Sequence, residues 1–215
     1  NLLPNEYLYY YYYREQAVEN IRKSRHTRGE QIVRLNEKLL SRVATALQEE
    51  NLQQALTSYE QLMSERSSSY MSNETGTSSS EESVSLEAEG YENLALSIIE
   101  GIVHNEKKVL ILNVRNEGVI ADLHDDDVVE VPCLVDRNGP VPLAVGKVPD
   151  SVQGLIQSVK AYERLTVAAA VTGDYEQALL ALAVHPLVCS HTLAKKILDD
   201  YLVEHETYLK HLKKE

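Results

Sequence analysis

The chain has 215 residues, with 33 Asp and Glu against 21 Lys and Arg, so its formal net charge is −12. A chain this acidic is a poor candidate for general nucleic-acid binding, which needs a basic face. Its two cysteines exclude a disulfide scaffold, and no apolar run reaches the roughly 18 residues of a membrane span. We therefore expect a cytoplasmic protein without a signal peptide, nucleic-acid partner or membrane partner.

The aromatic residues are used unevenly, with 13 Tyr but no Trp and no Phe. Six of the tyrosines fall within residues 7–13, in a chain that opens without Met. This abrupt beginning suggests a piece of a longer protein.

The first third of the chain is predicted to form helices followed by a polar segment. A helix is expected over 4–25, where no Gly or Pro interrupts the sequence after Pro4. A second helix begins near Thr27, and a third covers residues 52–62. Residues 67–89 hold nine Ser and five Glu with few large apolar side chains. That composition predicts a mobile loop or disordered insertion, not a boundary between domains, because too little surface is buried to offset the ordering entropy.

The remainder is predicted to form a small sheet between helices. Apolar residues at helical spacing predict a helix that starts near Tyr91, and residues 109–112 form a short buried strand. Strands over 128–135 and 141–145 flank Asn138-Gly139, a hairpin turn signal, and Pro132 and Pro142 suggest edge positions.

From Pro149 onward the chain is predicted to be helical. One helix ends at Gly173, a second covers 174–184 before Pro186, and the last carries Leu193–Leu209. The predicted fold class is therefore α+β, with helices packed on a small mixed or antiparallel sheet in one domain over 1–215.

No G-x-G-x-x-G, P-loop or G-x-S-x-G motif is present, so the candidate chemistry lies elsewhere. A tyrosine of the 7–13 run can act as a proton-transfer base if nearby positive charge stabilises its phenolate; half-buried packing is the alternative. The Arg25-His26-Thr27-Arg28 segment, at the start of a helix, is either an anion site or a solvated basic turn.

Three further clusters allow a functional and an ordinary interpretation. His185, Cys189 and His191 could ligate a metal, but they straddle a proline at a helix junction. Residues 124–127 could bind a hard cation, although an acidic turn is favoured. Residues 116–118 follow a buried strand and form either a functional loop or a simple turn.

Together these segments resemble glycoside hydrolase family 4, and most of all its 6-phospho-β-glucosidases. The similarity is carried by six blocks, at residues 4–11, 26–28, 113–120, 129–146, 169–175 and 194–199. The second block is the short motif His26-Thr27-Arg28, and the fourth, which contains Val129–Val135, is the most distinctive. The resemblance covers nearly the whole chain except 67–89.

The resemblance implies that the chain is the C-terminal half of an enzyme about twice as long. Such a domain resembles the α+β substrate domain of lactate and malate dehydrogenases, and the missing half would be the Rossmann domain that binds NAD. In this family NAD⁺ takes hydride from C3 of the sugar, and a divalent metal, usually Mn²⁺, polarises the oxygens. A tyrosine then removes the C2 proton, the aglycone is eliminated, water adds and the hydride returns.

Matched motif by motif, the resemblance makes Tyr7 the base and Arg28 a ligand of the substrate's 6-phosphate. One additional residue separates these motifs here, so Tyr9 or Tyr10 stays open as the base. Asn116 and Gly118 are implied to line the pocket. The family's Cys and His metal ligands lie upstream of residue 1, so no residue of this chain is expected to bind the metal or NAD.

The resemblance therefore predicts an NAD- and Mn-dependent 6-phospho-β-glucosidase that acts on phosphorylated disaccharides as a homodimer or homotetramer. The 215-residue chain alone is expected to be inactive. Alternatives are a phospho-α-glucosidase or α-galactosidase of the same family, and a non-catalytic helical interaction module whose tyrosines form a partner surface.

Overall fold

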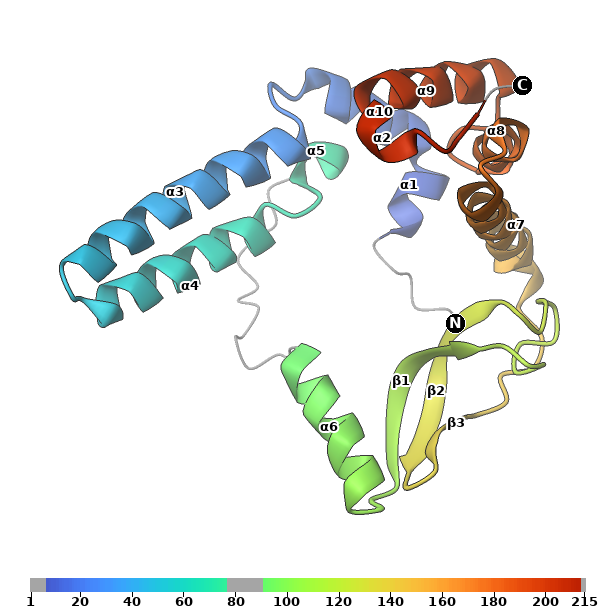
Figure 1. The fold of residues 1–215 in the computed structure, drawn as a ribbon, viewed down its shortest axis with the longest axis horizontal. Helices are drawn as coiled ribbons and strands as arrows, with labels where there is room; N and C mark the ends of the chain where they lie inside the picture. Colours follow the sequence, from blue (N-terminus) through green and yellow to red (C-terminus); the bar gives the residue numbers. More distant parts are fainter. Residues whose placement is uncertain (1–6, 77–90, 214–215) are drawn as a thin grey trace. The chain divides into compact units, whose positions relative to one another are not determined.

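The computed structural model describes residues 7–76 and 91–213 (Figure 1). The chain divides into two compact units, residues 1–88 and 89–215. The sequence did not predict this division, because the serine-rich segment was expected to be an insertion within one domain. Each unit is described by itself below.

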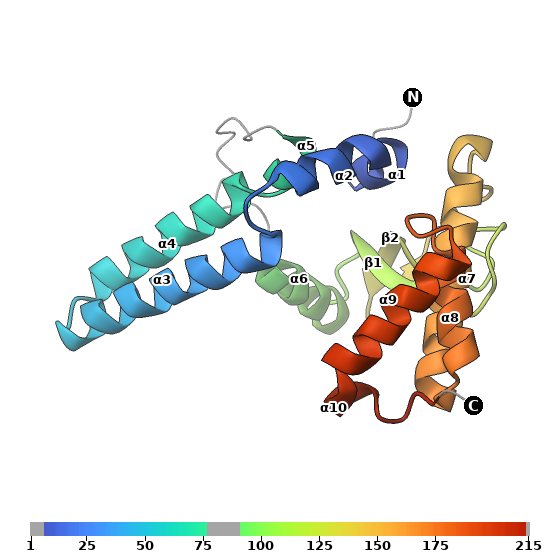
Figure 2. The ribbon, with the colours of Figure 1, turned by 90° about the horizontal axis from the view of Figure 1, so that it is seen from above.

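The first unit is helical. Its described elements are α1 (Leu8–Tyr12), α2 (Arg14–Lys23), α3 (Arg28–Gln48), α4 (Leu52–Ser68) and α5 (Ser72–Thr75). Helices α3 and α4 lie antiparallel along each other and bury Ala46 and Leu62 (Figures 1 and 2). The single helix expected over 4–25 is kinked at Tyr13, where φ is −120° and ψ is 33°. Residues 4–6 of that expectation lie outside the described residues.

The start of α3 is fixed by a capping box, which confirms the predicted beginning near Thr27. The Thr27 side chain accepts a hydrogen bond from the Glu30 backbone N–H at 3.2 Å. The Glu30 carboxylate accepts one from the Thr27 N–H at 2.7 Å. Two orphan donors of the first turn are thus satisfied reciprocally, and Arg28 becomes the first residue of the helix.

The polar segment differs from its predicted disorder over residues 67–76. Helix α4 continues to Ser68, and α5 packs against α2. The Asn20 side-chain amide donates to the Glu74 carbonyl at 2.8 Å, and the Asn73 amide donates to the His26 carbonyl at 3.2 Å. These bonds join residues about fifty positions apart and offset the ordering entropy that the local composition cannot. Residues 77–89 lie outside the described residues.

The second unit contains the sheet. It begins with α6 (Tyr91–Val103), followed by β1 (Lys108–Arg115), β2 (Val128–Asp136) and β3 (Gly139–Pro142), in antiparallel order β1-β2-β3. Burial alternates along β2, and its inward side chains form a core with the loop that follows β1. Those inward residues are Val129, Val131 and Cys133, and Val135 is buried further along the strand. The predicted α+β class is confirmed, and the sheet is antiparallel.

The hairpin turn lies one residue earlier than predicted. Asp136 pairs with Gly139, so Arg137 and Asn138 form the turn, and Gly139 takes φ +94°. Gly139, the residue after the turn, thus takes a positive φ that glycine adopts at no steric cost. Pro142 lies on edge strand β3 as expected, but Pro132 lies in the central strand. Pro132 lacks a backbone N–H, but the pairing of β2 with β3 ends at Cys133. Few hydrogen bonds between the strands are therefore lost at Pro132.

The second unit closes with helices. These are α7 (Asp150–Thr172), α8 (Tyr175–Val184), α9 (His191–Glu204) and α10 (Glu206–Leu209). Helix α7 ends at Gly173 and α8 before Pro186, as predicted, whereas the last predicted helix is interrupted at His205. A second core, centred on Tyr175 and Leu179, joins α8 to α9. Across residues 7–76 and 91–213, the helices are too short or too polar to span a bilayer.

Candidate functional site

Part of the tyrosine run meets α3 and α5 in a group of ionisable side chains. We call Tyr7, Tyr10, Arg28 and Glu74 the tyrosine–glutamate cluster. The Tyr10 phenol lies close to the Glu74 carboxylate and interacts electrostatically with it, with Tyr7 and with Arg28. Tyr7 is 52% exposed, and its ring lies edge-on to Tyr70 with centroids 6.4 Å apart. The structure therefore brings two sequence-predicted residues, Tyr7 and Arg28, to the same phenol.

The environment of Tyr10 disfavours its phenolate. Burial first, and then the negative charge and hydrogen bond of Glu74, raise the pKa of Tyr10 to about 12, while Arg28 opposes them. A phenol held protonated in this way donates a hydrogen bond and is a poor proton acceptor near neutral pH. Tyr9 instead stacks on Tyr13, with ring centroids 5.2 Å apart and planes 17° apart.

Arg28 closes the end of α4. One terminal nitrogen of its guanidinium donates to the Ser69 carbonyl at 3.3 Å and the Ser69 hydroxyl at 2.7 Å. The other donates to the Arg66 carbonyl at 2.8 Å. A cation at a helix C-terminus interacts favourably with the orphan carbonyls and the dipole. Because guanidinium carries five N–H donors, these three bonds leave capacity for a bidentate anion.

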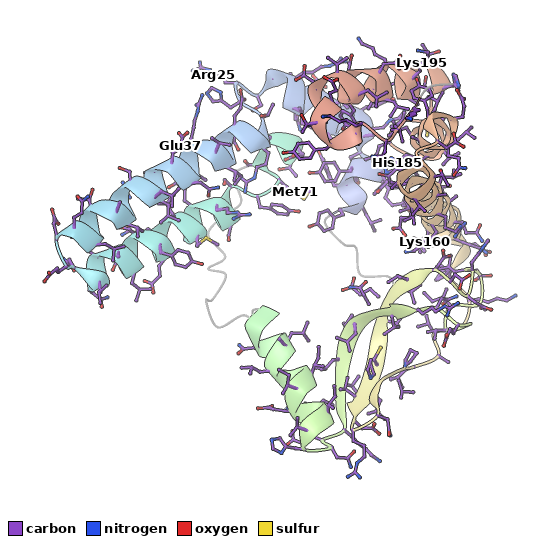
Figure 3. The ribbon with its side chains drawn as sticks, viewed as in Figure 1. Arg25, Glu37, Met71, Lys160, His185 and Lys195 are labelled. Atoms are coloured by element: carbon purple, nitrogen blue, oxygen red, sulfur yellow. The ribbon has the colours of Figure 1, made fainter. Side chains whose placement is uncertain are left out.

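The other members of the predicted anion segment are engaged locally. The His26 Nε2 atom lies 2.8 Å from a terminal nitrogen of Arg34. The Glu30 carboxylate accepts the hydrogen bond of the Thr27 N–H at the start of α3. Arg25 is exposed at the turn between α2 and α3 (Figure 3). Of the two arginines in residues 25–28, Arg28 is the one that belongs to the tyrosine–glutamate cluster.

In the second unit, the Asn116 side chain is bonded within its own loop. Its side chain is fully buried, and its amide nitrogen donates to the carbonyls of Ile120, Leu123 and His124 at 3.0–3.2 Å. Its amide oxygen accepts from the Ile120 N–H at 2.8 Å. All of these bonds lie within the loop between β1 and β2, so Asn116 organises that loop from inside.

Gly118 lies at the exposed bend of the same loop, where it takes φ +84° and a Cβ would meet nothing within 4 Å. The acidic stretch that could have held a cation is engaged with protein groups. Asp127 is 5% exposed and accepts from one Arg164 nitrogen at 2.7 and 2.8 Å, and Arg115 pairs with Asp126. The structure therefore favours the acidic-turn interpretation of residues 124–127.

In the possible metal site of His185, Cys189 and His191, the His185 side chain is engaged by structural contacts. The His185 ring packs edge-on against Tyr162 at 4.6 Å and accepts a hydrogen bond from the Leu187 N–H, and burial lowers its pKa (Figure 3). Across the described ranges, no three His, Cys, Asp or Glu side chains are grouped as metal ligands. The described residues therefore do not fit a manganese centre by themselves.

Comparison with known proteins defines the class of the chain as a glycosidase domain. Residues 1–188 match the family model described as Family 4 glycosyl hydrolase C-terminal domain. The chain belongs to this family.

Relatives of both anomeric specificities are similar to the chain. A probable 6-phospho-β-glucosidase of Bacillus subtilis is 46% identical over 119 residues, 55% of this chain and 27% of the relative. A maltose-6′-phosphate glucosidase of Fusobacterium mortiferum is 28% identical over 206 residues, 96% of this chain and 40% of the relative. The chain thus spans less than half the length of these relatives.

Solved structures support the same assignment. The 6-phospho-β-glucosidase of Thermotoga maritima, solved with manganese, NAD⁺ and glucose-6-phosphate, superposes with a TM-score of 0.66 at 26% identity. The match covers 96% of this chain and 42% of that enzyme. A 6-phospho-α-glucosidase from gut microorganisms, in complex with NAD and glucose-6-phosphate, gives a TM-score of 0.54 at 35% identity over 57% of this chain and 28% of that one.

Proposed function

We propose that the chain is the C-terminal, substrate-binding half of an NAD- and manganese-dependent 6-phospho-β-glucosidase. The observation that carries this proposal is the family match over residues 1–188, together with the 46% identity to the Bacillus subtilis relative. The phosphorylated disaccharide would be bound and deprotonated by a cytoplasmic homodimer or homotetramer. Both cofactors are assigned mainly to the N-terminal half of the longer enzyme.

Within this function, Tyr7 is proposed as the base that takes the C2 proton. It is half exposed, whereas the pKa of Tyr10 is raised to about 12 and Tyr9 stacks on Tyr13. Arg28, which interacts with the same Tyr10 phenol, supplies nearby positive charge of the kind a phenolate needs.

Arg28 is proposed to bind the 6-phosphate through the N–H donors that its bonds to α4 leave over. Those bonds fix the guanidinium plane, and a fixed fork suits bidentate recognition of phosphate. Asn116 contributes indirectly by shaping the loop that presents Gly118.

A phospho-α-glucosidase is the second candidate, favoured by the α-specific relative that aligns with 96% of the chain. The two candidates are separated by turnover of the paired α- and β-anomers of a nitrophenyl 6-phosphoglucoside, measured with NAD⁺ and Mn²⁺ on the longer enzyme. We expect the β-anomer to be preferred and the non-phosphorylated β-glucoside to be inert. A preference for the α-anomer would replace the primary proposal by the second.

The same assay on the 215-residue chain alone tests whether this half needs the other half for turnover. We expect no turnover, because the proposal places cofactor binding in the other half. Clear turnover would contradict that placement.

A further inference from the structure

Helices α3 and α4 each carry a stripe of large apolar side chains that is exposed. On α3 the stripe repeats every seven residues, and on α4 it follows a spacing of four and then three residues. Residues at these intervals lie on one face of a helix, because each residue turns the chain by about 100°. We call these side chains the α3–α4 face. They are 47–71% exposed and are Val33, Leu40 and Leu47 on α3, and Leu52, Leu56 and Tyr59 on α4.

The two stripes lie on the same side of the α3–α4 pair, whose helices run side by side (Figures 1 and 2). The other side of the pair is an open polar hollow of about 640 Å³. The hollow is lined from both helices, by Arg42 and Thr45 of α3 and by Thr57 and Gln61 of α4 among others. On each helix the buried residue, Ala46 or Leu62, lies between the hollow and the stripe around the helix axis. Both stripes therefore point away from the hollow.

The stripes also match in their position along the helices. Residues 49–51 form the tip at which α3 passes into α4, so Leu47 and Leu52 lie at the same level. Both helices rise about 1.5 Å per residue. Leu40 and Tyr59, each seven residues further from the tip, are therefore level with each other as well.

These matched levels suit a second copy of the chain. A two-fold axis parallel to the helices places α3 of one copy over α4 of the other, as in an antiparallel four-helix bundle. Leu47 then meets the partner's Leu52, and Leu40 meets the partner's Tyr59. Each of these contacts occurs twice, so apolar side chains cover apolar side chains throughout.

The charge of this part of the chain agrees with the same occupant. Residues 1–76 contain nine Lys and Arg against ten Glu and no Asp, so nearly all of the net charge of −12 belongs to the rest of the chain. Two copies can therefore approach through α3 and α4 with little of the like-charge repulsion that an acidic chain otherwise carries.

The size of the face is adequate for a stable pair. Two helices side by side are about 20 Å wide, and Val33 and Leu47 are about 21 Å apart along the axis, which gives about 400 Å² in plan. The accessible surface of packed side chains exceeds its plan area. The face thus approaches the roughly 800 Å² per partner of a standard interface.

We propose that the α3–α4 face is a self-association surface, through which two copies of the chain pair as an antiparallel four-helix bundle. The inference stands on the described helices. It names a surface for the homodimer that the proposed function includes, but its test does not use turnover.

The first test is the mass of the 215-residue chain in solution, measured by sedimentation equilibrium at about 1–100 μM. The parent should have twice its monomer mass of 24.2 kDa. Leu40→Glu should raise the dissociation constant about 100-fold, because it places a charge against apolar side chains and enters the interface twice. Ser41→Glu, which adds the same charge one residue along on the side of the polar hollow, is the matched control and should change it by no more than about twofold.

The second test mixes two variants that should each pair poorly alone. Leu40→Glu and Tyr59→Lys place opposite charges at positions that meet across the proposed axis. Their mixture should therefore form a dimer about tenfold tighter than either variant alone. Circular dichroism checks the fold of each variant, and Tyr59→Lys also serves by itself if Leu40→Glu does not fold, because it should weaken the parent dimer in the same way.

Three outcomes would overturn the proposal. A parent chain that stays at 24.2 kDa would leave the face to the N-terminal half of the longer enzyme. A dimer that persists in folded Leu40→Glu would use another surface, and a mixture that stays monomeric would contradict the pairing of α3 with the partner's α4. None of these results bears on the proposed function, which is judged by its own anomer assay.

Discussion

Replacement of Asn116 should unfold the loop between β1 and β2 at a cost that can be worked out from its bonds. In Asn116→Ala the Ile120 N–H and the Leu123 carbonyl lose the partner that the structure shows. The carbonyls of Ile120 and His124 retain backbone donors. Two part-buried groups left unpaired, at about 1–3 kcal/mol each, predict a loss of about 2–6 kcal/mol.

Asn116→Asp is a sharper test because it keeps the shape. A carboxylate oxygen would then lie where the amide nitrogen now donates to three carbonyls. The folded-state pKa of the introduced carboxyl would be raised above its unfolded value of about 3.9, so the folded state binds the proton more tightly. The variant should therefore be most stable below about pH 4 and lose stability as the pH rises through the raised folded-state value.

The assay is hydrogen exchange at the Ile120 amide, because the two compact units can unfold separately and a single unfolding midpoint would mix them. Asn113→Ala, which changes an exposed asparagine on β1 just before this loop, is the matched control and should change protection by no more than about 0.5 kcal/mol. A loss at Asn116→Ala below about 1 kcal/mol, or equal protection in the two variants, would refute the reasoning.

Three further outcomes are expected. Tyr7→Phe should lower kcat of the longer enzyme about 10²–10⁴-fold while NAD affinity stays unchanged, and an unchanged kcat would move the base to another tyrosine. Arg28→Ala should raise KM for the phosphorylated glucoside more than Arg25→Ala does, and equal KM values in the two variants would remove Arg28 from the phosphate site. Gly173→Ala should cost about 1–3 kcal/mol, measured by hydrogen exchange at the amides of α8, because Gly173 takes φ +75° and a Cβ there would lie 2.3 Å from the His211 carbonyl oxygen. Gly154→Ala in α7 has open space around the new Cβ and should be neutral or stabilising by the same measurement.

The elements that local chemistry determines were predictable from the sequence. Thr27 followed by Glu30 is a capping box, and the glycine after Thr172 ends a helix in the left-handed region. The strand over 128–135 was predicted beside a hairpin turn signal, and the structure has β2 over Val128–Asp136. These signals act within a few residues, so no tertiary information is needed to interpret them.

The parts that failed depend on partners distant in sequence. Helix α5 was missed because its order comes from Asn20 and from the contact of Asn73 with His26, neither of which a serine-rich window reveals. Glu74 was missed with it, although the Ser72-to-Gly76 pattern of a short capped turn was available as a signal. Asn116 was placed in the right loop, but only the structure shows that its side chain points inward.

The kink at Tyr13 separates the segment that carries Tyr7 from the segment that packs against α5. In an uninterrupted helix, each added residue rotates everything beyond it by about 100° and advances it about 1.5 Å. Because α1 ends at Tyr12 and α2 restarts at Arg14, a change of length at this joint redirects the segment that bears Tyr7 without turning Asn20 away from α5. A change of length at Tyr13 would therefore move the segment that carries Tyr7, the proposed base, while the contact of α2 with α5 is kept.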